Sequence, residues 1–299
     1  MGISQYIKQI GRRNGGRPLT REQATDLFGQ VLDGAPSDLE VGAFCLAMRL
    51  KGETPEELCG FLDATHARLN LVPAGVRPLV VLPSYNGARR LPVLTPLLAL
   101  LLARRGAPVL VHGTPTESGR VFAASVLRAL DLHPLEQVRA IAPGEAAYLP
   151  TALLNPRLAW LLEARQLIGL RNSGHSVVKL MNPCAGDAVI VSSYTHAEYQ
   201  SSMAEVFGIL GASALLLRGT EGEATADARR MPAMEGFRRG RREVLQERLS
   251  GALATPPELA PAIDAESTAA YTQDVLAGRK AVPAAIAAQV EHILRLSAP

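Results

Sequence analysis

The sequence predicts an α/β protein in which a small helical N-terminal domain precedes a larger domain with a mainly parallel central sheet flanked by helices. Three observations support this fold class. Helix start signals crowd residues 1–72, short apolar runs alternate with helical patterns over residues 75–299, and 47% of the 299 residues are hydrophobic, enough for a sizeable core. A further helical segment near residues 155–169 is expected to pack on the first domain.

The helical domain is predicted from its start and stop signals. It begins with a short segment whose apolar residues, at positions 3, 6, 7 and 10, share one helical face. Three later segments fit the capping box, in which two side chains three positions apart bond each other's backbone amides. These segments are Thr20–Gln23, Ser37–Glu40 and Thr54–Glu57. Gly34 and Gly52 stand where helices are expected to end.

The larger domain alternates strand and helix patterns. Short apolar strands are predicted at Leu79–Leu82, Val109–Val111, Ala188–Ser192 and Ala214–Leu217. Helices are predicted directly after the first of these strands and at Val121–Leu130, Gln200–Leu210, Glu266–Ala277 and Pro283–Leu296. Strands separated by helices form a parallel sheet that the helices cover.

The charge and the apolar runs exclude some classes of function. A formal net charge of +3 rules out a polybasic character along the whole chain, so an anion site must come from local clusters. The start of the sequence lacks the apolar core of a signal peptide, and the longest apolar run, residues 91–103, is too short to span a bilayer. We therefore expect a cytoplasmic protein with no membrane partner.

No metal and no cofactor is expected. Acidic residues gather in RGTEGEATAD, at Glu221, Glu223 and Asp227. Acids in a turn after a strand are more typical of solvated or capping side chains than of metal ligands. The six histidines lack the spacing of a zinc site.

The turn after the first predicted strand has unusual chemistry. The stretch VVLPSYNGARRLP, residues 80–92, has the strand–turn–helix pattern of a phosphate-binding unit, but such turns are usually rich in glycine. Here a single Gly87 is followed by Arg89 and Arg90. Cations in the first turn of a helix oppose its macrodipole, and either a bound polyanion or a neighbouring carboxylate would offset that cost.

A second basic cluster lies at the start of the chain. The first 21 residues contain no acidic residue, and KQIGRRNGGRP combines glycines with cations. Arginine presents a planar fork of donors that matches phosphate oxygens. A binding loop and a merely soluble terminus are equal interpretations of this cluster, whose members are Lys8, Arg12, Arg13, Arg17 and Arg21.

A third cluster contains four arginines in EGFRRGRREVL, at positions 238, 239, 241 and 242. Acidic residues flank it at Glu235 and Glu243. A solvated face and a binding site are therefore equally good interpretations.

Four stretches of the chain resemble anthranilate phosphoribosyltransferases, in the same order and at roughly the same separations. They are MRLKGETPEELCGFLDA, LVHGTPTESGR, ARQLIGLRNSGHSVVKLMNP and LLLRGTEGEATADARR. The resemblance covers nearly the whole chain and extends to the class that includes the pyrimidine nucleoside phosphorylases. It implies a nucleoside phosphorylase/phosphoribosyltransferase-like fold and dimerisation through the helices.

The same resemblance implies that the phosphate chemistry of those enzymes is lost. The family's Gly-Thr-Gly-Gly-Asp loop, which wraps the pyrophosphate, corresponds to PSYNGARR. The family's Lys-His-Gly-Asn has no lysine here, and its magnesium-binding Asp-Glu pair has no carboxylate. Losing these groups together should leave little transferase activity, since electrostatic stabilisation is usually the largest catalytic effect. The vestigial positions are Gly87, His112, Gly113, Thr114, Ala224, Thr225 and Arg165, the last matching the arginine that meets the aromatic acceptor.

The chain also resembles a divergent branch of this family, the YbiB-type DNA-binding proteins. That resemblance implies a homodimer, joined through the helical domain, that binds nucleic acid through basic grooves with little sequence preference. The predicted function is therefore binding of DNA or RNA by its phosphates. The predicted nucleic-acid-binding residues are Lys8, Arg12, Arg13, Arg17, Arg89, Arg90, Arg171 and Lys179.

The sequence is also compatible with two other functions. The retained His112, Gly113 and Arg165 are compatible with an active glycosyl- or phosphoribosyltransferase that uses an altered acceptor. A dimeric scaffold whose basic loop binds an acidic protein is the third interpretation.

Overall fold

The chain forms two compact units in a computed structural model that describes residues 2–12, 15–253 and 255–298. One unit combines Met1–Asn70 with Thr151–Pro183, and the other combines Leu71–Pro150 with Cys184–Pro299. The first unit is helical and the second contains the sheet. Arg13 lies outside the described residues, so the prediction made for it stays a prediction. Among the described residues, each helix is too short or too polar to cross a membrane.

The helical unit is built from the capped segments that the sequence predicts. The three capping boxes are all formed, beginning at Thr20, Ser37 and Thr54. Asn155 caps a further helix by accepting the N–H of Leu158 at 2.8 Å. The helices are α1 (Ser4–Ile10), α2 (Arg21–Leu32), α3 (Asp38–Lys51), α4 (Pro55–His66), α7 (Thr151–Leu154), α8 (Pro156–Ile168) and α9 (Gly174–Leu180).

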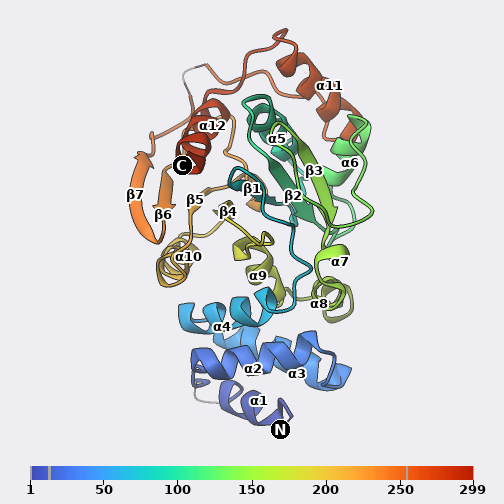
Figure 1. The fold of residues 1–299 in the computed structure, drawn as a ribbon, viewed down its shortest axis with the longest axis vertical. Helices are drawn as coiled ribbons and strands as arrows, with labels where there is room; N and C mark the ends of the chain where they lie inside the picture. The colour runs from blue at the N-terminus through green and yellow to red at the C-terminus, as the bar shows by residue number, and fades with distance from the viewer. Residues whose placement is uncertain (1, 13–14, 254, 299) are drawn as a thin grey trace. The chain divides into compact units, whose positions relative to one another are not determined.

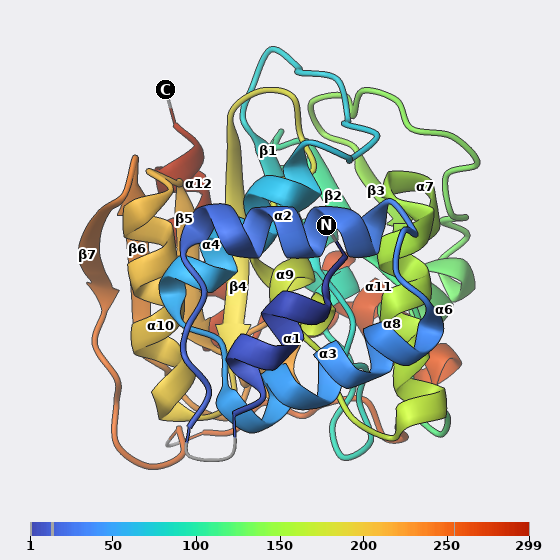
Figure 2. The ribbon, with the colours of Figure 1, turned by 90° about the horizontal axis from the view of Figure 1, so that it is seen from below.

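Aromatic side chains form the centre of the helical unit. The ring of Phe28 stacks on that of Phe61 with centroids 4.8 Å apart, and Phe44 meets both rings edge-on. Helix α1 packs against α3, and Figure 2 shows the two helices side by side. Helices α8 and α9 contact α2 and α4 respectively, so the segment around residues 155–169 belongs to this unit.

The α/β unit contains a seven-stranded sheet in the order β3-β2-β1-β4-β5-β6-β7 (Figure 1). Strands β1 to β5 are parallel, and β6 and β7 add an antiparallel edge. The strands are β1 (Leu79–Pro83), β2 (Val109–Gly113), β3 (Ala146–Pro150), β4 (Ala188–Tyr194), β5 (Ala214–Arg218), β6 (Met234–Arg238) and β7 (Arg241–Gln246). The helices are α5 (Thr95–Arg104), α6 (Ala123–Ala129), α10 (Ala197–Ile209), α11 (Ala265–Leu276), α12 (Ala284–Ser297) and the 3₁₀ turn Thr220–Gly222.

The sheet is buried by helices of its own unit. Alternate residues of β1, β2, β4 and β5 point into one apolar core with side chains of α5, α6, α11 and α12, as the two-residue period of a strand requires. Helix α10 contacts β4 and β5, and Phe207 of α10 meets Phe237 of β6 with ring centroids 5.3 Å apart. The predicted fold class, a helical N-terminal domain and an α/β domain with a mainly parallel sheet, is confirmed.

One local prediction was wrong. The helix expected directly after the turn of β1 begins only at Thr95, so Arg89 and Arg90 lie in an irregular segment and the macrodipole argument does not apply to them. The arginine cluster around residues 238–242, for which the sequence predicted no secondary structure, lies on the hairpin of β6 and β7.

Candidate functional site

Three loops meet at the carboxyl edge of the sheet. In open α/β sheets, ligands bind outside the carboxyl ends of the strands, where the strand order reverses. Here the order reverses at β1, which has β2 on one side and β4 on the other. The turn after β1 is therefore the place where a ligand is expected, and its residues from Ser84 to Ala88 are buried.

Glu223, which follows β5, lies inside this turn. Its Oε1 accepts the backbone N–H groups of Asn86 and Gly87 at 2.9 and 2.8 Å. Its Oε2 accepts the hydroxyls of Ser84 and Thr95 at 2.5 and 3.0 Å. Only 2% of Glu223 is exposed. Backbone amides and hydroxyls in such a turn are the donors that would hold a phosphate, and here a carboxylate of the same chain takes all four.

Glu221 continues the arrangement along the chain. Its carboxylate accepts the backbone N–H groups of residues 89–91 at 2.8 to 3.2 Å. The side chain of Arg120 lies 3.8 Å from Glu221 and 2.8 Å from Glu117 and is largely buried. A carboxylate of the chain therefore satisfies the backbone amides of residues 89–91.

Gly222 allows both glutamates to reach the turn. It has a φ of +84°, which favours glycine, and a Cβ at this position would lie 2.1 Å from Nδ2 of Asn86. That Nδ2 donates to the carbonyl of Gly222 at 2.5 Å. A larger residue between Glu221 and Glu223 would push the loop away from the turn.

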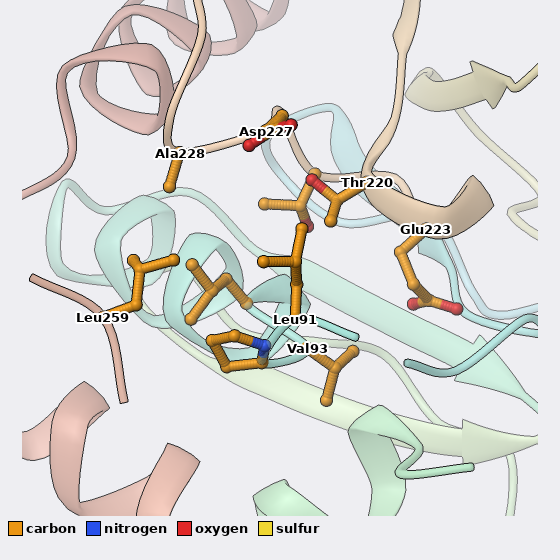
Figure 3. A pocket seen from close by; sticks show the side chains of 10 residues that line it. Leu91, Val93, Thr220, Glu223, Asp227, Ala228 and Leu259 are labelled. Atoms are coloured by element: carbon orange, nitrogen blue, oxygen red, sulfur yellow. The ribbon is translucent and has the colours of Figure 1, made fainter. Parts of the chain in front are cut away.

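Little space remains beside the two carboxylates. The adjoining pocket lies between residues 91–94 and the connection from β5 to β6, and Figure 3 shows Leu91, Val93, Thr220 and Glu223 among its lining side chains. Its volume is about 10 Å³, room for about one water molecule. A sugar diphosphate does not fit here unless Glu223 is displaced.

The positions that correspond to a magnesium-binding pair do not fit a divalent cation. Ala224 has no side-chain oxygen, and the hydroxyl of Thr225 lies 3.0 Å from that of Thr95, which itself donates to Glu223. The carboxylates of Glu221 and Glu223 are already surrounded by N–H and O–H donors. Magnesium needs oxygen ligands in near-octahedral geometry, and these residues do not offer them.

His112 is part of a buried structural contact. Its Nδ1 lies 2.7 Å from the hydroxyl of Tyr85, and burial lowers the pKa of His112 to about 3. The ring is therefore neutral near pH 7 and adds no positive charge to an anion site. A Cβ on Gly113 would lie 2.0 Å from the carbonyl oxygen of Ser84, so glycine is required there for packing. Thr114, just after β2, is half-buried.

The side chains of Arg89 and Arg90 reach the surface although their backbone is held by Glu221. The Arg89 side chain is 55% exposed, and its closest ion-pair contact is Glu117 at 3.9 Å. Arg90 is also exposed. Both guanidinium groups thus remain accessible beside a turn whose amides are occupied.

The basic loop after α1 is closed at its base. The N–H of Arg17 donates to the carbonyl of Gln9 at 3.1 Å. Gly16 approaches so closely that a Cβ would lie 1.7 Å from the carbonyl oxygen of Ile10, which excludes any other residue. The described cations of the cluster are Lys8 in the last turn of α1 and Arg12 and Arg17 in the loop. All three are exposed and form no ion pair with a carboxylate of the described residues.

A third group of cations surrounds His175 in the helical unit. Burial, together with the positive charges of Arg171, Arg165 and Lys179, lowers the pKa of His175 to about 3. The three cations are half-buried and lie close to one imidazole, which stays neutral near pH 7. The structure therefore brings Arg171 and Lys179 together with Arg165.

The described candidates thus form three groups, two in the helical unit and one, Arg89 with Arg90, in the α/β unit. Sequence reasoning missed the central role of Glu221 and Glu223 and the presence of Arg120 behind them. One pattern in the sequence could have revealed this role: TEGE, residues 220–223, follows a buried strand and places a glycine between two glutamates. Because β1 and β5 are parallel strands of one sheet, the segments that follow them start at the same edge.

Comparison with known proteins identifies relatives of the chain. Residues 4–68 match the family described as "Glycosyl transferase family, helical bundle domain". The chain is 37% identical to "Uncharacterized protein YbiB" of Escherichia coli (strain K12), over 97% of this chain and 92% of that one. It is 29% identical to anthranilate phosphoribosyltransferase 2 of Ralstonia nicotianae, over 71% and 63% of the two chains. The solved anthranilate phosphoribosyltransferase of Thermus thermophilus superposes with a TM-score of 0.71 at 21% identity, covering 99% of this chain and 87% of that one.

Proposed function

The chain belongs to the anthranilate phosphoribosyltransferase-like family, in the branch that contains YbiB, and on that premise we propose that it binds nucleic acid rather than transferring phosphoribosyl groups. The proposed ligand is the phosphate backbone of DNA or RNA, recognised with little sequence preference. The proposed contacts come from the exposed cations Lys8, Arg12 and Arg17 and from Arg89 and Arg90.

One observation carries the proposal. The amides and hydroxyls of the turn after β1 are filled by Glu223 and Glu221, while the arginine side chains of the same turn remain exposed. A site whose donors already hold carboxylates has little left for a small phosphate ester. Exposed guanidinium groups suit a polyanion, because they contact phosphate oxygens without requiring a closed pocket. Arg171 and Lys179 add two half-buried cations in the helical unit.

The first test is the dependence of binding on salt. A dimer that neutralises about six phosphates should bind with log K falling linearly with log salt at a slope of about −5, because each contact releases condensed counterions. Gel-shift or fluorescence-anisotropy titrations of an oligonucleotide from about 0.05 to about 0.5 M salt measure that slope. Absence of binding at low salt, or affinity that is indifferent to salt, would contradict the proposal.

A homodimer joined through the helical unit is part of the proposal, and the exposed face of α3 supports it. Leu39, Leu46 and Leu50 are 84%, 46% and 79% exposed, and with Ala43 they follow the spacing of one helical stripe. An exposed apolar stripe on a helix is typical of a protein–protein contact.

Leu46→Glu is therefore expected to convert the dimer to monomer, since it places a charge in the middle of the stripe without disturbing a buried side chain. Sedimentation velocity measures the change. Val76→Glu is the matched control, because Val76 is 90% exposed in the α/β unit and the substitution also replaces an exposed apolar side chain with glutamate. A dimer that survives Leu46→Glu, or a wild-type protein that is monomeric at micromolar concentration, would argue against this interface.

The transferase alternative has a direct test that separates it from nucleic-acid binding. Isothermal titration with phosphoribosyl pyrophosphate and Mg²⁺ should give no heat at millimolar ligand, since Glu223 occupies the donors that would hold the diphosphate. Clear saturable heat would favour the transferase.

A further inference from the structure

An open hollow lies between the β6–β7 hairpin and the last turn of α12. It has a volume of about 450 Å³ and is lined by Arg238, Arg241, Arg242, Glu243 and Arg295. It is distinct from the turn after β1 and from the cations of the helical unit. Four of its five lining residues are arginines, so the hollow is dominated by one sign of charge.

The strand register forces two of these arginines together. Arg238 and Arg241 are directly opposite each other at the end of the hairpin. Like charges in a cross-strand pair repel each other, so this arrangement weakens the hairpin unless an anion lies between or near them. Charged residues on an edge strand such as β7 can also protect a sheet from pairing with another chain. That role requires charged side chains, but it does not require two arginines directly opposite each other.

The carboxylates nearby neutralise only two of the four arginines that line the hollow. Arg242 is paired with Glu235 at 2.5 Å and Arg295 with Glu243 at 3.1 Å. Arg238 donates to the main-chain carbonyl of Arg295, which leaves its charge uncompensated. Arg241 is exposed and forms no ion pair with a carboxylate of the described residues. A hollow with an excess of one charge focuses its field on a ligand of the opposite sign.

We propose that this arginine hollow is a further phosphate-binding site, and that its ligand is the phosphate backbone of the bound nucleic acid. The proposal rests on the nucleic-acid-binding function and adds a contact that lies on the β6–β7 edge of the sheet. Arg238 and Arg241 supply the forked donors and the uncompensated positive charge, while Arg242 and Arg295 are held by Glu235 and Glu243.

The test compares two single variants of the full-length protein that each remove one arginine from the same hairpin. Arg241→Ala removes a lining residue and is expected, for each protomer whose hollow contacts the oligonucleotide, to weaken binding about fivefold at about 0.15 M salt and to reduce the salt slope by about 0.9. Arg239→Asn removes an arginine that does not line the hollow. It also suits the turn, because residue 239 has a φ of +48° before Gly240. This control should change affinity less than twofold.

The double variant Arg238→Ala/Arg241→Ala is expected, for each contacting protomer, to weaken binding about 30-fold and to reduce the slope by about 1.8. Equal affinities and slopes for Arg241→Ala and Arg239→Asn would overturn the proposal, even if the wild-type protein binds nucleic acid. Failure of the wild-type protein to bind would instead overturn the proposed function itself.

A titration with inorganic phosphate shows whether the hollow binds a free phosphate ion or the phosphate backbone of nucleic acid. If the hollow holds a free phosphate, millimolar phosphate should raise the melting temperature of the wild type but not of Arg241→Ala, while oligonucleotide affinity stays equal in both. That result would overturn the assignment to the nucleic-acid backbone. Weaker oligonucleotide binding by Arg241→Ala, with no phosphate effect on melting, supports it.

Discussion

Replacing Glu223 with alanine is expected to lower the free energy of unfolding by about 3–5 kcal/mol, because the change leaves several buried donors without an acceptor. The two amides of Asn86 and Gly87 and the hydroxyls of Ser84 and Thr95 all donate to this one carboxylate. An orphaned buried donor costs about 1–3 kcal/mol, and partial relaxation and entry of water reduce the total below the sum of four. Urea unfolding followed by circular dichroism measures the loss.

Two controls show whether the effect comes from the donors. Glu223→Gln keeps one acceptor oxygen and nearly the same volume, so it should cost clearly less than the alanine variant. Glu221→Ala should also cost less, because Glu221 is partly exposed and water can replace it at the amides of residues 89–91. A loss below about 1 kcal/mol for Glu223→Ala would mean that the carboxylate is not what holds the turn.

The double variant Arg12→Ala/Arg17→Ala is expected to weaken binding of every oligonucleotide sequence at about 0.15 M salt by about 30-fold for each protomer whose loop contacts the oligonucleotide. Both side chains are exposed and belong to the loop that is closed by the bond between Arg17 and Gln9. Each lost phosphate contact removes about 0.9 from the salt slope and about a factor of five in affinity. Phosphate contacts carry no base information, so the loss should be uniform across sequences.

Arg77→Ala/Arg128→Ala is the matched control for this variant. Arg77 and Arg128 are exposed arginines of the α/β unit that take part in none of the proposed contacts, and their removal changes the net charge by the same amount. The control separates a local contact from the effect of net charge alone. Equal losses in the two double variants would place the binding surface elsewhere.

The parts of the fold that could be predicted depend on local chemistry. A capping box is complete within four residues, so the starts of α2, α3 and α4 were correct from the sequence. The buried parallel strands β1, β2, β4 and β5 were found because both of their faces are apolar. The hairpin of β6 and β7 was missed because its edge strand is highly charged and its apolar alternation is weak.

The candidate site could be predicted only in part, because its most important contacts join distant residues. Glu223 bonds to Gly87 across 136 positions in the sequence, and no local pattern reports such a pairing. The start of α5 was misplaced for the same reason: the amides of residues 89–91 do not need a helix, since Glu221 satisfies them. The composition of the turn did indicate that it is poor in glycine. It also indicated that Arg89 and Arg90 would lie near either a bound polyanion or a carboxylate of the chain.

The carboxylate in the turn after β1 also changes how the fold responds to its surroundings. A protein that binds a small metabolite gains stability as that metabolite accumulates and loses it as the pool is depleted. Here the group that accepts the donors of the turn is covalently part of the chain, so its presence does not depend on the concentration of a small ligand. The contribution of these hydrogen bonds to the stability of the α/β unit is therefore independent of any metabolite pool, and Arg89 and Arg90 follow a turn that the chain itself holds in place.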